Sequence, residues 1–270
     1  MTTLAPSSNG SRTILRRILD SAWLYRLLAF AIFGAVWQIA TLGSKNLLVP
    51  TFFETAIAFP QLLLDPVVWR AMLISNQALV VGFAAAIALG IPIGLLMGRY
   101  RAAERFTNVY INIMLVMPVA ALIPLMLMSV GIGLASRVII VVLFSITMVI
   151  VNSRTGVRQV DPALIEMARC FGATERDIWR RVLLPGALPA IMTGVRIGLG
   201  RAITGMVIVE LLLVSVGLGN LVNRFSANFQ PERLYALIII IVLEALVLIS
   251  LARWIERRAA PWVRIAGFRE

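Results

Sequence analysis

The segment 161–185, DPALIEMARCFGATERDIWRRVLLP, carries the densest cluster of charge in a chain that is otherwise strongly apolar. Asp161 followed by Pro162 is typical of a helix start, because the aspartate side chain accepts a free backbone N–H and proline fits the first helical position. Apolar side chains then recur at helical spacing and form one face: Leu164, Met167, Ala168 and Phe171. Gly172 can adopt the left-handed backbone that ends a helix. The sequence therefore predicts an amphipathic helix between Asp161 and Gly172.

A second helix start follows this glycine. Thr174 and Asp177 are spaced as in a capping box, with aspartate in place of the usual glutamate or glutamine. A second apolar face is formed by Ile178, Trp179, Val182 and Leu183. Arg180 and Arg181 lie near the C-terminal turn, where they favour the helix dipole, and Pro185 is predicted to end the helix. We therefore expect two short amphipathic helices joined at a glycine bend.

The residues of this helix pair leave two interpretations open. The apolar faces could lie in the headgroup region of a membrane, as many amphipathic helices do. Alternatively, the pair could bind a partner protein. In either case the segment is too polar to be buried in lipid and too regularly patterned to be a loose linker.

The composition of the whole chain is that of a membrane protein. Of its 270 residues 60% are hydrophobic and only 14% are charged, and the mean hydropathy is +0.92. The net charge of +12 does not indicate nucleic-acid binding, because the charges separate apolar runs and no pattern of aromatic and basic residues accompanies them. The chain has no histidine and a single cysteine, Cys170, so we expect neither a metal site nor an internal disulfide.

Six apolar runs approach the length that a helix needs to cross a bilayer, which is about 17 to 25 residues. They cover residues 23–42, 72–97, 106–130, 138–151, 188–214 and 234–251, and the fourth run is short and could begin as early as Leu134. No part of the sequence resembles a second, soluble domain. The predicted fold class is therefore an all-α polytopic membrane protein with six transmembrane helices.

The positions of the basic residues predict how these helices are oriented, because loops rich in arginine and lysine stay in the cytoplasm. With the N-terminus inside, the inner segments hold most of the arginines and the outer segments hold only Lys45, Arg70, Arg137, Arg224 and Arg233. Both termini are therefore expected in the cytoplasm. We expect a cytoplasmic tail over 1–22, a membrane domain over 23–252 with a cytoplasmic loop at 152–185, and a cytoplasmic tail over 253–270.

Small residues and prolines mark special positions within the spans. Two stripes of small residues recur at helical spacing and predict close helix packing or, as the alternative, a pore lining: Gly82, Ala86, Gly90, Gly94 and Gly98, and then Gly194, Gly198 and Ala202. Pro92, Pro118 and Pro124 each remove a backbone hydrogen bond. Such breaks are tolerated beside protein or a water-filled cavity, so they indicate a pathway between helices.

Four charged residues lie inside predicted spans, where a charge is expensive and indicates function. Arg196 is near the cytoplasmic end and is expected to extend to the interface. Arg201 suits either an ion pair within the bundle or an electropositive lining for an anionic substrate. Glu210 is nine residues after Arg201 and therefore lies on the opposite side of the helix. It suits a gate or an intersubunit salt bridge. Glu244 is compatible with a buried pair or with a lipid-facing position.

The segment 161–185 also resembles a known family motif. The family motif has the spacing E-A-A, x3, G, x9, I-x-L-P. This chain matches it with Glu166, Met167, Ala168, Gly172, Val182, Leu184 and Pro185, in which methionine replaces the first alanine and valine replaces isoleucine. This pattern is typical of the permease subunits of binding-protein-dependent ABC importers. The chain is similar to the nitrate, sulfonate and taurine branch in further segments: 118–125, 131–133, 152–161, 194–202, and Val209-Glu210 followed by Gly217-Leu218-Gly219.

This resemblance implies a type I importer fold, in which two six-span permeases pair around a central pathway and each binds a cytoplasmic ATPase subunit. An extracytoplasmic binding protein delivers the substrate, and residues 49–66 and 217–231 are its expected landing surface. The coupling residues would be Asp161, Glu166, Met167, Ala168, Gly172, Ala173, Val182, Leu184 and Pro185. The candidate pathway residues are Pro118, Pro124, Arg201 and Glu210.

The expected function is therefore the permease subunit of an ATP-driven importer in the cell's inner membrane, for a small anionic solute such as nitrate, a sulfonate or taurine. The chain lacks the G-x-x-x-x-G-K-[ST] loop that holds phosphates, so ATP is expected on the partner and this chain is expected to be neither an enzyme nor a cofactor-binding protein. One alternative is a permease for a pyrimidine precursor of thiamine. Another is a channel or secondary carrier without an ATPase, although no inverted repeat is visible.

Overall fold

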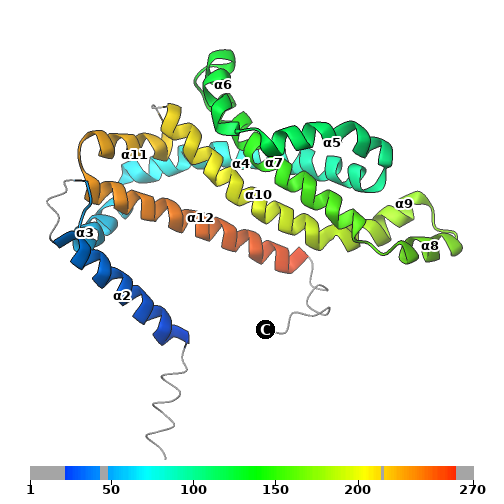
Figure 1. Cartoon of the computed structure of the whole chain (residues 1–270), viewed down its shortest axis with the longest axis horizontal. Coiled ribbons are helices and arrows are strands. Elements are labelled where there is room, and N and C mark those ends of the chain that lie inside the picture. The colour runs from blue at the N-terminus through cyan, green and yellow to red at the C-terminus, as the bar shows by residue number, and fades with distance from the viewer. Residues whose placement is uncertain (1–21, 43–47, 214–215, 260–270) are drawn as a thin grey trace, which may run out of the picture.

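The computed structural model describes residues 22–42, 48–213 and 216–259, and the regular structure within them is helical (Figure 1). Most of the two predicted tails lies outside these residues, although α12 continues as far as Ala259. The elements in chain order are α2 (Ala22–Leu42), α3 (Phe52–Leu63), α4 (Pro66–Arg99), α5 (Arg101–Val116), the 3₁₀ helix η1 (Val119–Leu122), α6 (Ile123–Val130), α7 (Leu134–Arg158), α8 (Pro162–Cys170), α9 (Glu175–Ile178), the π-helical turn η2 (Trp179–Leu183), α10 (Leu184–Leu213), α11 (Gly217–Ala227) and α12 (Pro231–Ala259).

Five helices in the described part are long and apolar enough to cross a membrane, and a sixth span arises if the bent pair of α5 and the segment Val119–Val130 counts as one. These two parts meet at 90°, so the predicted span 106–130 is not a straight helix. The break falls at Pro118, which cannot donate a hydrogen bond and forces Met117 into an extended conformation with ψ 126°. Pro124 lies in the first turn of α6, where proline is tolerated.

The centre of the molecule is a layer in which α7 lies between α4 and α10. The stripe of small residues on α4 allows this approach, because a Cβ at Gly94 would come within 2.5 Å of the Ile150 oxygen of α7. On the other side, a Cβ at Gly194 would come within 2.6 Å of Asn152. The packing interpretation of both stripes is therefore confirmed, and the pore-lining alternative is wrong for these faces.

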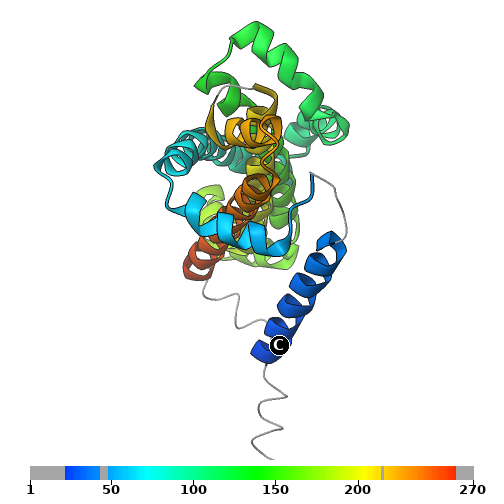
Figure 2. The same ribbon diagram turned by 90° about the vertical axis from the view of Figure 1, so that its left-hand side faces the viewer.

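The remaining helices lie around this layer. An apolar cluster joins α3, α11 and α12 to the start of α4, with Leu62, Leu218 and Leu237 buried in it. Figure 1 shows α3 and α11 at the end of the molecule opposite to α8 and α9. In both views α2 projects away from the other helices (Figures 1 and 2). It is attached through Trp37, whose indole nitrogen donates to the Pro50 oxygen at 3.1 Å and whose ring lies against Phe52.

The prediction that Pro185 ends a helix is wrong. The chain passes from α9 through η2 into α10 as one helical rod, and the amide of Leu184 donates to the oxygen of Trp179, five residues back. Pro185 lacks an N–H, and its ring would collide with a carbonyl of the preceding turn in a regular α-helix. The wide turn before Pro185 accommodates this, so the helix that begins at Glu175 continues into the predicted fifth span.

The contact between α4 and α7 gives a first testable prediction. In Gly94→Ala the new methyl group would collide with the backbone of α7, so we expect a loss of about 1 to 3 kcal/mol in stability. The control is Gly200→Ala in α10, because a Cβ there meets no atom within 4 Å. Thermal unfolding in detergent, followed by size-exclusion chromatography, should show a lower midpoint for Gly94→Ala only. Equal midpoints for the two variants would contradict the close approach.

Candidate functional site

The first helix of the segment 161–185 is confirmed as α8. The side chain of Asp161 accepts the Ala163 N–H at 2.9 Å, and Pro162 occupies the first helical position. Gly172 has φ +75° and donates to the Arg169 oxygen at 2.9 Å, while Ala173 donates to the Ala168 oxygen at 3.0 Å. These two bonds form the Schellman motif that ends helices at a left-handed glycine. The glycine bend is therefore present where the sequence places it.

Two faces of α8 differ in what they contact. Ile165 and Ala168 pack against the cluster that contains Ile178 and Leu183. No residue of α8 is fully buried, and Glu166 and Met167 are exposed. Phe171, directly after the helix, is 85% exposed. The helix therefore presents an acidic and apolar outer surface that no described residue of this chain covers.

The predicted capping box of the second helix is also confirmed. The Thr174 hydroxyl accepts the Asp177 N–H at 3.3 Å, and the Asp177 carboxylate accepts the Thr174 N–H at 3.2 Å. Of the remaining motif residues, Ala173 and Val182 are partly buried in the cluster behind α8, whereas Leu184 is 38% exposed. Pro185 is partly buried at the start of α10. The motif residues are thus divided between an outer surface and the contact with the bundle.

Glu175 joins α8 to the central layer through contacts that the sequence does not predict. Arg99, the last residue of α4, donates to both oxygens of this carboxylate, at 2.7 and 3.1 Å. Arg169 in the last turn of α8 donates to the same carboxylate at 3.1 Å. The pair Arg99–Glu175 spans 76 residues of sequence, so no local spacing indicated it.

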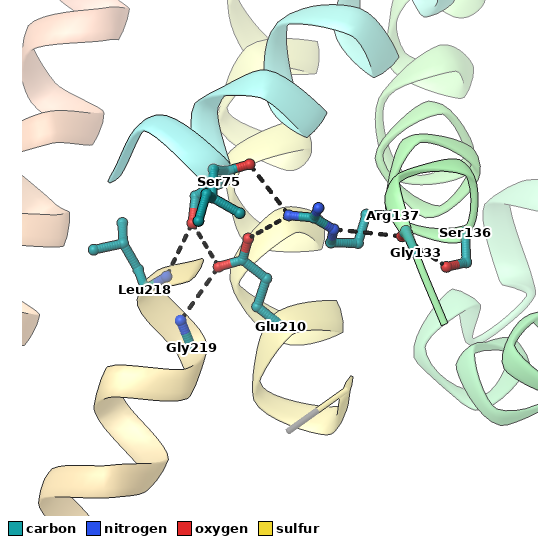
Figure 3. A network of polar contacts seen from close by, with 8 residues as sticks. Ser75, Gly133, Ser136, Arg137, Glu210, Leu218 and Gly219 are labelled. Carbon is teal, nitrogen blue, oxygen red and sulfur yellow. Dashed lines mark hydrogen bonds and ion pairs between the residues drawn. The ribbon is translucent and has the colours of Figure 1, made fainter. Parts of the chain in front are cut away.

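A buried polar network lies at the opposite end of the central layer (Figure 3). Glu210 is fully buried and accepts hydrogen bonds from the Ser75 hydroxyl at 2.7 Å and from the Gly219 N–H at 3.2 Å. Its other oxygen lies 3.4 Å from Nη1 of Arg137. The Ser75 hydroxyl in turn accepts the Leu218 N–H at 3.0 Å. The network therefore joins α4, α7, α10 and α11.

This network contains two charged residues that the sequence placed near the outer end of the spans. Arg137, expected in an outer segment, is 6% exposed within the first turn of α7. Glu210 has an ion pair with Arg137 of its own chain, and its role as a gate or in an intersubunit salt bridge stays a prediction. Gly217 has φ +71°, and a Cβ on it would collide with the Glu210 carboxylate. The glycine allows the start of α11 to lie directly on the buried acid.

Arg201 lies in a different setting from Glu210. It lines a cavity of about 270 Å³ together with Met114, Met117, Pro118, Phe144 and Thr147. It is exposed, and in the part of the chain that the structure describes it forms no ion pair. Of the four candidate pathway residues, the structure thus brings Arg201 and Pro118 to one cavity, whereas Glu210 is buried elsewhere and Pro124 is not part of the cavity lining.

The other two charges within the spans have partners. Arg196 lies 3.4 Å from the Glu256 carboxylate of α12, so it forms an ion pair instead of only extending to the interface. Glu244 of α12 accepts a hydrogen bond from the Asn76 amide of α4, and its second oxygen is buried without a partner among the described residues. The lipid-facing alternative for Glu244 is therefore wrong.

Comparison with known proteins agrees with this architecture. The family model described as "Binding-protein-dependent transport system inner membrane component" matches residues 90–261. The taurine transport system permease protein TauC of Escherichia coli K12 is 31% identical over 84% of each chain. The putative aliphatic sulfonates transport permease protein SsuC of Bacillus subtilis 168 is 30% identical over 89% of this chain and 88% of its own. An amino acid ABC transporter crystal structure is 18% identical, with a TM-score of 0.59 over 74% of this chain and 98% of that one.

The broken third span, the helical loop at α8 and the apolar bundle thus define a permease subunit of an ABC importer with the type I fold. The chain belongs to the family of binding-protein-dependent inner membrane transport components. It is therefore a multi-pass protein of the inner membrane and a non-catalytic subunit, and ATP is hydrolysed by a partner ATPase. The alternative of a channel or carrier without an ATPase is wrong.

The pair Arg137–Glu210 leads to a second prediction. Arg137→Met leaves the Glu210 carboxylate buried without its cation, which typically costs about 3 to 5 kcal/mol. In Arg137→Met with Glu210→Gln no charge remains, and the amide oxygen still accepts from Gly219, so this double variant should recover much of the lost stability. Thermal unfolding in detergent measures both.

The control for this prediction is Arg196→Met, which breaks the less buried pair with Glu256 and should cost only about 0 to 1 kcal/mol. If the double variant unfolds at a lower temperature than Arg137→Met, the buried charge is not what destabilises the single variant.

Proposed function

We propose that two copies of this chain form the translocation pathway of an ATP-driven importer for a small anionic solute, of the nitrate, sulfonate or taurine type. The observation that carries the coupling part of this proposal is the outer surface of α8, which is exposed and rigidly capped at both ends. The relatives TauC and SsuC support the class of solute, because TauC is named a taurine permease and SsuC a putative permease for aliphatic sulfonates, and taurine is itself a sulfonate. The structure adds Arg201, an exposed cation in a cavity whose lining is mostly apolar.

Coupling to the ATPase would take place through the residues Asp161, Glu166, Met167, Ala168, Gly172, Ala173, Val182, Leu184 and Pro185. Closure of the ATPase pair displaces α8, and two connections carry this displacement into the bundle. The Arg169–Glu175–Arg99 contacts link α8 to the end of α4. The continuous helix from Glu175 links the same loop to α10, which carries Arg201 and Glu210. An ATP-driven movement at α8 would therefore reach both helices that pack on α7.

The same proposal orients the chain, with α8 and both termini in the cytoplasm. The end that carries α3 and α11 then faces outward, where the binding protein lands on residues 49–66 and 217–231. A cavity of about 190 Å³ on this end is lined by Asp65, Arg224, Asn228, Gln230 and Arg233 among others. The charged and amide groups of this lining suit contact with a folded protein partner. The proposed cytoplasmic tails are 1–22 and 253–270.

Coupling is tested by Glu166→Lys and Gly172→Trp. The first reverses the charge on the outer surface of α8, and the second places a large side chain on a backbone with φ +75°, which strains the bend. In proteoliposomes that contain the permease, its ATPase and its binding protein, we expect uptake to fall at least about tenfold while ATP hydrolysis continues. The control is Arg257→Glu, a charge reversal on an exposed residue in the last turn of α12. Unchanged uptake in both α8 variants would exclude the coupling role.

The assembly itself is tested by purification. The permease, co-expressed with its ATPase and solubilised in detergent with a tag at its C-terminus, should retain the ATPase, and Glu166→Lys should weaken this association. Mass measurement of the purified complex should give two permease and two ATPase chains. If a single permease copy is found with its ATPase, the homodimer is wrong even where transport persists.

A further inference from the structure

Arg201 is a charged residue placed where charge is costly. It lies near the middle of α10, which runs from Leu184 to Leu213, far from either end. Its side chain is exposed to a cavity whose other lining groups are almost all apolar, including Met114, Met117 and Phe144. An ionised arginine at membrane depth needs a compensating negative charge or a water-filled space. The source of that negative charge is therefore a question about function.

Among the residues that the structure describes, no acidic side chain is available to neutralise Arg201. Of the 13 acidic residues, only Glu210 and Glu244 lie inside the predicted spans and away from their ends. Glu210 is fully buried against Arg137, Ser75 and Gly219. Glu244 lies on α12 and bonds to Asn76. A second copy of the chain has the same two acids in the same contacts, so a counter-ion at Arg201 would come from outside the permease.

The cavity has the dimensions and the polar groups for a small anion. Its volume of about 270 Å³ exceeds the roughly 30 Å³ that one water molecule occupies in the liquid, so a headgroup of a few heavy atoms fits. Thr147 lines the same cavity, and its hydroxyl has no hydrogen bond to a described residue. A guanidinium offers two parallel N–H donors that match the oxygens of a sulfonate, carboxylate or nitrate.

From these observations we propose that Arg201 and Thr147 form a binding site for the oxyanion headgroup of the transported solute within the permease. Arg201 would bind two oxygens of the headgroup and Thr147 would donate a hydrogen bond to a third. The inference deepens the proposed function, on which it rests for the transport of an anionic solute. It adds that the permease itself selects for an oxyanion, in addition to the selection made by the binding protein.

The charge preference of the cavity is measured with a cysteine placed in its wall. Ala120→Cys, in a Cys170→Ser background, puts a thiol on an exposed position of the cavity lining. The rate at which this thiol reacts is then measured in the purified transporter complex with three methanethiosulfonate reagents. They carry an anionic ethylsulfonate, a cationic ethyltrimethylammonium or a neutral methyl group. We expect Arg201→Gln to lower the ratio of anionic to cationic reaction rates about tenfold, the order of effect of one charge at several Å in a partly screened site.

The matched control is Arg196→Gln, which removes an arginine five residues earlier in the same helix and should leave the rate ratio unchanged. An equal ratio with and without Arg201 overturns the proposal. A thiol that the neutral reagent cannot reach also overturns it, because the cavity would then be closed to solutes.

Binding of the oxyanion is measured as protection of the same thiol. Millimolar methanesulfonate should slow the neutral reagent several-fold, and this protection should be lost in Arg201→Gln and weakened in Thr147→Val. Phospholipid phosphate has the same chemistry, so the measurement is made both in lipid nanodiscs and in phospholipid-depleted maltoside micelles. Protection in both supports a solute site, whereas protection only in the depleted micelles identifies lipid phosphate as the occupant and overturns the proposal.

Uptake separates this inference from the proposed function. Arg201→Gln should reduce uptake of the solute at least about tenfold while the binding protein still stimulates ATP hydrolysis. If Arg201→Gln transports normally and the α8 variants do not, the oxyanion site is wrong and the coupling proposal stands. If the α8 variants transport normally while methanesulfonate protection depends on Arg201, the coupling proposal is wrong and the site stands.

Discussion

The close approach of α4 and α10 to α7 is the constraint on which the rest of the structure depends. In a membrane the lipid is as apolar as the helices, so helix association depends on van der Waals contact and on the few polar groups that bond across helices. Glycine at positions such as Gly94 and Gly194 lets backbones meet, and Gly156 extends the same contact to α10, where a Cβ would come within 2.8 Å of the Ala187 oxygen. The polar network around Glu210 then fixes the rotation of the helices that this packing brings together.

Once the layer is fixed, charges within the bundle fall into two groups. Glu210 and Arg137 satisfy each other and the start of α11, so they act as part of the scaffold. Arg201 has no such partner in the described chain and faces a cavity. The difference between the two groups is visible only in three dimensions, because both are isolated charges in apolar runs of sequence.

Local features of this chain could be predicted from the sequence and long-range contacts could not. The caps at Asp161 and Thr174 and the bend at Gly172 depend on residues within a few positions of one another, so spacing alone indicates them. The stripes on α4 and α10 were predictable because close packing repeats every four residues. The pair Arg137–Glu210 joins residues that are 73 positions apart, so no local spacing indicates it. Arg137 is buried because α7 begins at Leu134 and includes it in the first turn, which the type of residue does not show. The continuation through Pro185 was missed because proline ends regular α-helices but not a helix that widens before it.

The π-helical turn at Trp179–Leu183 determines how the loop that carries α8 is rotated about the axis of α10. One residue of an α-helix corresponds to a rotation of about 100° around its axis. The extra residue in the wide turn therefore rotates the loop that carries α8, about the helix axis, relative to the face of α10 that carries Arg201. Removing a single residue from this turn would redirect the loop to another side of the helix, and it would also shorten the motif between Gly172 and Pro185 by one position. The extra residue thus sets the rotation of the α8 loop about the axis of α10, and this rotation does not depend on how strongly the loop binds its partner.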